Sequence, residues 1–110
     1  MKQWDICLFP FAEAGPHPAV IVSSDERCEN AGFASVNALS CTSLKSGSVP
    51  KPTQVLLDAA DGPDWPMVVR CDVMHLLAKQ DFSHPLGTVS IQPRRAIART
   101  IIACFRLQAW

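Results

Sequence analysis

The sequence has 110 residues, of which 48% are apolar and 18% are charged, and its ten basic side chains balance its ten acidic ones. This composition predicts one globular domain over residues 1–110, and any binding of nucleic acid has to come from a local patch rather than from net charge. The five cysteines form no C-x-x-C pair and no apolar segment is long enough for a signal sequence or a membrane span, so we expect a cytoplasmic protein with reduced thiols, no metal and no membrane contact.

Two strands are predicted near the N-terminus, over residues 4–11 and 17–23. The second follows a Gly-Pro-His-Pro sequence and continues through four consecutive apolar residues, which is typical of a strand buried on both faces. Proline fixes φ and removes an N–H, so Pro16 and Pro18 hold the backbone extended and place His17 in a defined direction. This imidazole is a candidate for chemistry at the mouth of a core strand, and equally a candidate for capping that strand.

The middle of the chain predicts a helical turn, two strands and a loop. A serine followed by two acidic residues favours a short helical turn after the second strand. A third strand over residues 33–41 ends in a Ser-Cys-Thr-Ser cluster, and residues 45–52 form a surface loop rich in Gly, Pro and Ser. A short strand over residues 53–57 follows, and the Asp-Gly-Pro-Asp sequence at 61–64 predicts a turn.

The last third of the chain predicts the longest strand over residues 67–77, a short strand over residues 86–91 and then a helix. Proline at position 93 is tolerated in the first turn of that helix, and apolar residues recur from Ile97 with the spacing of a packed helix face. These elements indicate a mainly β protein with a C-terminal helix, in which five or six short strands curl into a small barrel.

Five short segments lie in order along the chain: Trp-Asp-Ile at 4–6, Gly-Pro-His-Pro-Ala-Val-Ile-Val-Ser at 15–23, Ser-Cys-Thr-Ser at 40–43, Cys-Asp at 71–72 and Leu-Gly-Thr-Val-Ser at 86–90. In this order they resemble the G-D-I-W opening, the G-x-R-P-x-V-x-V-S segment, the P-x-T-S/T strand end, the C-D-Q-I-R segment and the G-x-L-S closing segment of one family. That family is the MazF/PemK (Kid-like) toxins of bacterial toxin–antitoxin systems.

The resemblance implies a small SH3-like barrel of the CcdB/PemK type that forms a homodimer and cuts single-stranded RNA, usually mRNA. It also implies a cognate antitoxin protein that blocks the same groove, and a reaction without metal or cofactor. In that reaction a ribose 2′-hydroxyl attacks the neighbouring phosphate and leaves a cyclic phosphate and a free 5′-hydroxyl. The chemistry needs a proton acceptor, a proton donor and a group that stabilises the charge of the phosphorane.

The resemblance places the catalytic site on His17 and Thr42. His17 stands where the family has an arginine, Val73 where it has a glutamine, and His75 where it has a further basic residue. Arginine is always charged and binds phosphate with two N–H groups, whereas histidine, with an unperturbed pKa of about 6.5, is the better proton shuttle near neutral pH. If the two histidines converge on one groove, one can accept the 2′-hydroxyl proton while the other protonates the leaving oxygen. Otherwise His17 caps its strand, and activity is lost or altered.

The remaining candidates each have a structural alternative. Thr42 is a hydroxyl donor to the scissile phosphate or an ordinary turn former, and Ser43 beside it is a weaker candidate for the same contact. Glu13, in the loop over the expected groove, is a substrate-binding residue, a base, a charge that repels the wrong partner, or a solvated acid. Asp72 interrupts an apolar strand, so we expect it to bond within the fold as a structural orienter.

Two classes of function remain open from the sequence. The first is a metal-independent toxin endoribonuclease that acts on single-stranded RNA. The second is a non-catalytic binding module of the same fold, or a DNA gyrase-directed toxin like CcdB, for which the terminal Trp110 is suggestive. In either case Ile102, on the helix, is a candidate contact of the homodimer.

Overall fold

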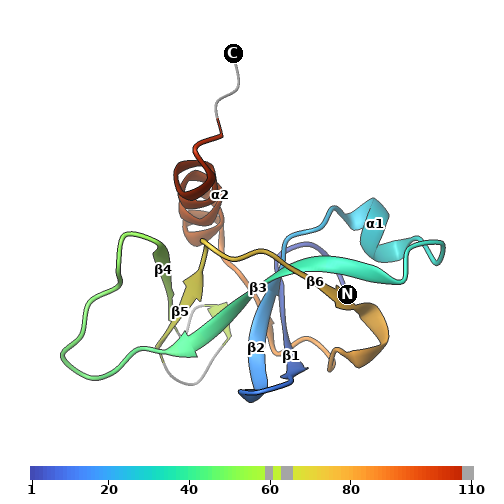
Figure 1. The fold of residues 1–110 in the computed structure, drawn as a ribbon, viewed down its shortest axis with the longest axis horizontal. Coiled ribbons are helices and arrows are strands. Elements are labelled where there is room, and N and C mark those ends of the chain that lie inside the picture. The colour runs from blue at the N-terminus through green and yellow to red at the C-terminus, as the bar shows by residue number, and fades with distance from the viewer. Residues whose placement is uncertain (59–60, 63–65, 108–110) are drawn as a thin grey trace.

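The structure is a computed structural model, and it describes residues 1–58, 61–62 and 66–107. In chain order its elements are β1 (Asp5–Phe11), β2 (Gly15–Ile21), α1 (Asp25–Glu29), β3 (Ser35–Ser43), β4 (Gln54–Leu57), β5 (Met67–Arg70), β6 (His75–Ala78), a 3₁₀ turn (Lys79–Asp81), β7 (Gly87–Thr88) and α2 (Ile91–Phe105). The strands form a curled antiparallel sheet, and α2 stands above one end of it (Figure 1).

β3 is the strand around which the sheet curls. The strand order is β4-β5-β3-β2-β1-β7, and β6 also pairs with β3. The first part of β3 pairs with β6, whereas its last three residues pair with β5. Because its first part pairs with β6 and its last part with β5, both antiparallel, the sheet bends along β3, as Figure 1 shows.

The prediction of one strand over residues 67–77 is wrong, because the structure divides it into β5 and β6. Val69 pairs with Cys41, and His75 pairs with Ala38. The chain therefore advances six residues along β5 and β6 while it advances only three along β3, so three residues are looped out of the ladder. Before this bend, β5 pairs with the last part of β3, and after it, β6 pairs with the first part of β3.

β2 is buried on both faces, as its unbroken apolar run predicts. Val20 belongs to the main core cluster, and Ala19 and Ile21 belong to a smaller cluster on the opposite face of the sheet. β3 pairs only with this apolar end of β2. The earlier, proline-containing part of β2 pairs with β1 alone, and a strand bonded on one side only tolerates proline.

The predicted strand over residues 86–91 is shorter than expected, since only Gly87–Thr88 forms β7. The chain turns into α2 because the Asp61 carboxylate accepts hydrogen bonds from the backbone N–H and the hydroxyl of Ser90, both at 2.7 Å. A Cβ on Gly87 would lie 2.3 Å from the carbonyl oxygen of Asp61, so glycine permits this close approach. Gly62, at φ +108°, supports the predicted turn, whose remaining residues 63–64 lie outside the described part.

α2 covers the main core with the apolar face that its spacing predicts. Ile97 is fully buried, Ile101 and Cys104 pack against the same cluster, and Phe105 is exposed. The other members of that cluster lie in the strands or directly after them: Ile6, Val20, Leu39, Cys41, Val55, Leu57, Met67, Val69, Cys71 and Val89. Among the described residues, no helix is long and apolar enough to cross a membrane.

Candidate functional site

A groove of about 440 Å³ opens where the β1–β2 hairpin, the end of β3 and the β5–β6 bend meet. Four of the five side chains predicted from the sequence line it: Glu13, His17, Thr42 and His75. Its other lining residues are Phe11, Ala14, Ser40, Cys41, Arg70 and Val73. Ser43, the fifth predicted residue, pairs with Met67 and lies outside this lining.

His17 is held by the β1–β2 ladder. It lies opposite Phe9, and its Nδ1 is 3.2 Å from the carbonyl oxygen of Gly15. When Nδ1 carries the proton and donates to that carbonyl, Nε2 is the nitrogen with the free lone pair. The carbonyl contact expected of a strand cap is therefore present, and the same contact orients an unoccupied Nε2 within the groove lining.

His75 is brought to the groove by the bend between β5 and β6. It is the first residue of β6, opposite Ala38, and its ring packs against that of Phe11 with 5.3 Å between centroids at 60°. This edge-to-face contact restricts the imidazole without using either ring nitrogen. Both histidines therefore line one groove, which is the arrangement that proton transfer in both directions requires.

Thr42 adds a hydroxyl to the groove that the two imidazoles line. It lies in β3 opposite Val68, and strand alternation exposes it while the preceding Cys41 is buried. Burial raises the pKa of Cys41 to about 12, so this thiol at the groove stays protonated and is not a nucleophile. Glu13 lies in the β1–β2 loop, where its side chain is exposed.

Arg70 is a groove residue that the sequence analysis missed. It is the last residue of β5, opposite Gln54, and its Nη2 lies 3.5 Å from Oδ2 of Asp72. The two side chains are 45% and 36% exposed, and an ion pair this exposed holds the guanidinium only weakly. Arg70 is the one Lys or Arg among the described residues that line the groove. The signal that could have found it is an arginine that interrupts an apolar strand directly before the Cys-Asp motif.

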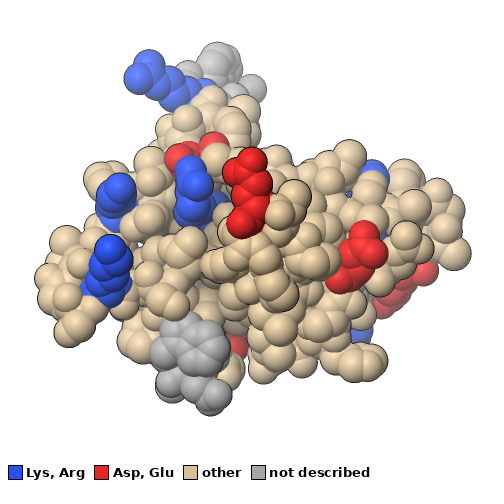
Figure 2. All heavy atoms as spheres, turned by 60° about the horizontal axis from the view of Figure 1, so that its bottom comes forward, with Lys and Arg blue, Asp and Glu red and all other residues tan. Residues whose placement is uncertain are grey.

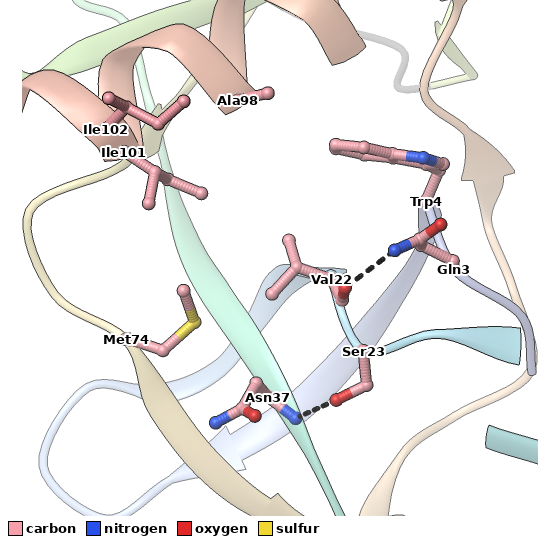
Figure 3. A pocket seen from close by; sticks show the side chains of 9 residues that line it. All are labelled: Gln3, Trp4, Val22, Ser23, Asn37, Met74, Ala98, Ile101 and Ile102. Atoms are coloured by element: carbon pink, nitrogen blue, oxygen red, sulfur yellow. Dashed lines mark hydrogen bonds between the residues drawn. The ribbon is translucent and has the colours of Figure 1, made fainter. Parts of the chain in front are cut away.

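A second hollow, also of about 440 Å³, lies between α2 and the sheet (Figure 3). Its walls are mainly apolar, with Trp4, Met74 and Ile101 facing one another across it, and no titratable side chain lines it. Ile102, the predicted dimer contact, is at its rim and 49% exposed. The hydroxyl of Ser23, which also lines the hollow, accepts a hydrogen bond from the backbone N–H of Asn37 at 2.7 Å.

The described residues contain no group of three or more His, Cys, Asp and Glu side chains that could hold a metal ion. Trp110, on which the gyrase-directed alternative depends, lies outside the described part of the chain.

The family model for the "PemK-like, MazF-like toxin of type II toxin-antitoxin system" matches residues 2–105. The chain belongs to this toxin family. A comparison with curated protein sequences gave no match.

Solved structures of MazF proteins and of a mycobacterial endoribonuclease have the same fold. Mycobacterium tuberculosis toxin MazF-mt6 aligns with a TM-score of 0.80 at 22% identity, over 96% of this chain and 99% of that one. An endoribonuclease in complex with its cognate antitoxin, from a mycobacterial species, aligns with a TM-score of 0.78 at 21% identity, over 100% and 97%. A MazE–MazF structure from Deinococcus radiodurans aligns with a TM-score of 0.77 at 18% identity, over 98% of each chain. These matches confirm the predicted SH3-like barrel with its C-terminal helix as a MazF/PemK fold.

Proposed function

We propose that this MazF/PemK-family toxin cleaves single-stranded mRNA without a metal ion, by attack of a ribose 2′-hydroxyl on the adjacent phosphate. The observation that carries the proposal is the convergence of two imidazoles, one hydroxyl and one guanidinium on a single groove. These groups match what the reaction needs: a base, an acid and donors that stabilise the charge of the phosphorane.

The two histidines have different roles in this mechanism. His17 donates from Nδ1 to the Gly15 carbonyl, so its Nε2 is the base that accepts the 2′-hydroxyl proton. The bond from O2′ to phosphorus then forms while the bond from phosphorus to O5′ breaks. His75, as an imidazolium, gives its proton to the departing O5′. The products are a 2′,3′-cyclic phosphate and a free 5′-hydroxyl, and the two histidines have exchanged protonation states.

Arg70 and Thr42 bind the reacting phosphate in this mechanism. The guanidinium of Arg70 stays charged at every relevant pH and presents N–H groups that match phosphate oxygens. It therefore supplies the permanent positive charge that His17 lacks. The Thr42 hydroxyl donates to a second phosphate oxygen. Glu13, which lines the groove, and Ser43, which lies outside the lining next to Thr42, are the proposed further contacts to the RNA.

The partners follow from the family and from the neighbouring structures. One similar structure is an endoribonuclease in complex with its cognate antitoxin, and another holds MazE together with MazF. We propose that residues 1–110 act as one toxin domain, that a cognate antitoxin blocks the groove, and that the toxin works as a homodimer in the cytoplasm, where mRNA is available. Ile102, exposed on α2, is the proposed dimer contact.

A cleavage assay with matched histidine variants tests the proposal. The protein is incubated with a random-sequence pool of single-stranded RNA in EDTA, and the ends of the products are sequenced. We expect 5′-hydroxyl ends at a short preferred sequence, and a rate that falls by about 10²-fold or more in His17→Ala and in His75→Ala. His84→Ala is the matched control, because His84 is exposed and does not line the groove. Intact RNA after incubation with the wild-type protein contradicts the proposal.

A further inference from the structure

The connection between β3 and β4, residues 44–53, carries two exposed lysines, Lys45 and Lys51. Figure 1 shows this connection projecting away from the sheet on the side of β4 and β5. Neither lysine side chain has an ion-pair or hydrogen-bond partner among the described residues. Both positive charges are therefore available to a ligand.

The backbone holds both lysines in place although their side chains are free. The carbonyl of Lys45 accepts a hydrogen bond from the N–H of Ser48 at 3.0 Å. The carbonyl of Lys51 accepts from the N–H of Gln54 at 2.9 Å, and the N–H of Lys51 donates to Oε1 of the same glutamine at 2.9 Å. Each lysine thus opens a hydrogen-bonded turn, so the backbone at each lysine is held while the ammonium group stays free to reach a ligand.

The connection that carries these charges joins two strands beside the groove. Lys45 follows Thr42 by three residues, and the Lys51 turn ends at Gln54, which pairs with Arg70. In Figure 2 the blue side chains gather on the left of this face, where Figure 1 places the connection, β4 and β5. Glu13, the acid of the groove lining, comes instead from the β1–β2 loop. The one arginine and the one glutamate among the described residues of the groove lining therefore come from different parts of the sheet.

We propose that the β3–β4 connection is an RNA-binding arm, in which Lys45 and Lys51 bind phosphates of the RNA strand beyond the scissile one. This inference rests on the proposed function. RNA binding by a chain with no net charge requires a local basic patch, and the arm extends such a patch outward from Arg70.

The chemistry of lysine defines what the arm contributes. A lysine ammonium is a compact charge on a flexible stem, and contacts to phosphate fix the register of a strand without reading its bases. The arm therefore raises affinity for long strands, and the preferred cleavage sequence is read elsewhere in the groove.

The salt dependence of binding tests the arm. The probes are a single-stranded DNA of about 15 nucleotides, which lacks the 2′-hydroxyl and is not cleaved, and a trinucleotide that spans only the groove. Each phosphate contact to a single strand contributes about 0.7 to the slope of log K against log salt concentration. Lys45→Gln/Lys51→Gln should therefore lower the magnitude of the slope by about 1.4 on the long probe. Between 50 and 200 mM salt, the wild type should lose about seven-fold more affinity than this variant.

Arg95→Gln/Arg99→Gln is the matched control, because it removes two exposed positive charges from α2. We expect it to keep the wild-type slope, and we expect no difference between the lysine variant and the wild type on the trinucleotide. In cleavage of a long RNA, the lysine variant should raise KM more than it lowers kcat.

These measurements distinguish a failure of the proposed arm from a failure of the proposed RNA cleavage. If the wild type cleaves RNA while the lysine variant keeps the wild-type slope and KM, the arm is overturned and the proposed function stands. If the salt slope falls equally in the lysine and arginine variants, the arm is also overturned, because the change then reflects the net charge of the protein. If the wild type neither binds the long strand nor cleaves RNA, the arm and the proposed function both fail.

Discussion

Removing the guanidinium of Arg70 should slow RNA cleavage by about 10- to 100-fold. A well-placed donor to a developing oxyanion contributes about 2.7–4 kcal/mol in an enclosed site. Arg70 is 45% exposed and is shared with Asp72 at 3.5 Å, so solvent screens its contact with phosphate. We therefore use the general range for a hydrogen bond to a charged group, which is about 1.5–3 kcal/mol. Since about 1.4 kcal/mol corresponds to a factor of ten, Arg70→Gln should lower kcat/KM by one to two orders of magnitude.

The assay is single-turnover cleavage of single-stranded RNA in EDTA. Arg70→Lys keeps the positive charge but loses the two parallel N–H groups, so its rate should lie between those of the wild type and Arg70→Gln. Arg99→Gln removes an exposed arginine outside the groove and should cleave like the wild type. Breaking the exposed pair with Asp72 should change the free energy of unfolding by less than about 1 kcal/mol, so a slow variant is still a folded one. A wild-type rate in Arg70→Gln refutes the role of the guanidinium.

Three further predictions concern stability. Ile97→Ala, in the core, should lower the free energy of unfolding by about 2–5 kcal/mol in urea titrations, against less than about 1 kcal/mol for the exposed Ile91→Ala; equal losses contradict the packing of α2. Asp61→Ala should cost about 1–3 kcal/mol and Asp61→Asn less, because the amide keeps an acceptor for Ser90; an unchanged urea midpoint in Asp61→Ala shows that the carboxylate does not anchor α2. Burial raises the pKa of Cys41 from 9.0 to about 12, so above about pH 9 the unfolded chain loses this proton while the folded chain keeps it, and stability falls as pH rises. The urea midpoint should drop between pH 8 and pH 10 in the wild type and drop less in Cys41→Ala.

Much of the groove is predictable because its parts have local signals. The paired prolines around His17 and the polar end of β3 at Thr42 are visible in short windows, and the order of the motifs indicates the fold. Burial of β2 on both faces also follows from its unbroken apolar run. Local patterns do not predict that His17 and Thr42 line one groove, because this depends on how β1, β2 and β3 pair.

The errors share one physical cause, which is pairing between distant strands. The apolar run over residues 67–77 looks continuous, and only its two registers against β3 require the bend between β5 and β6. Arg70 was missed for the same reason, since an arginine at a strand end reaches the groove only once β5 lies beside β3. The last strand was predicted too long because a buried carboxylate 29 residues away, Asp61, turns the chain at Ser90.

The central claim is that His17 and His75 act in one proton-transfer step, and a double-mutant comparison of cleavage rates tests it most directly. Residues that act as a unit have strongly non-additive effects, so the double variant should be about as slow as the slower single variant. The wild-type products should end in a 2′,3′-cyclic phosphate and a 5′-hydroxyl, in EDTA. Wild-type rates in both single variants, or losses that multiply in the double variant, would contradict the claim.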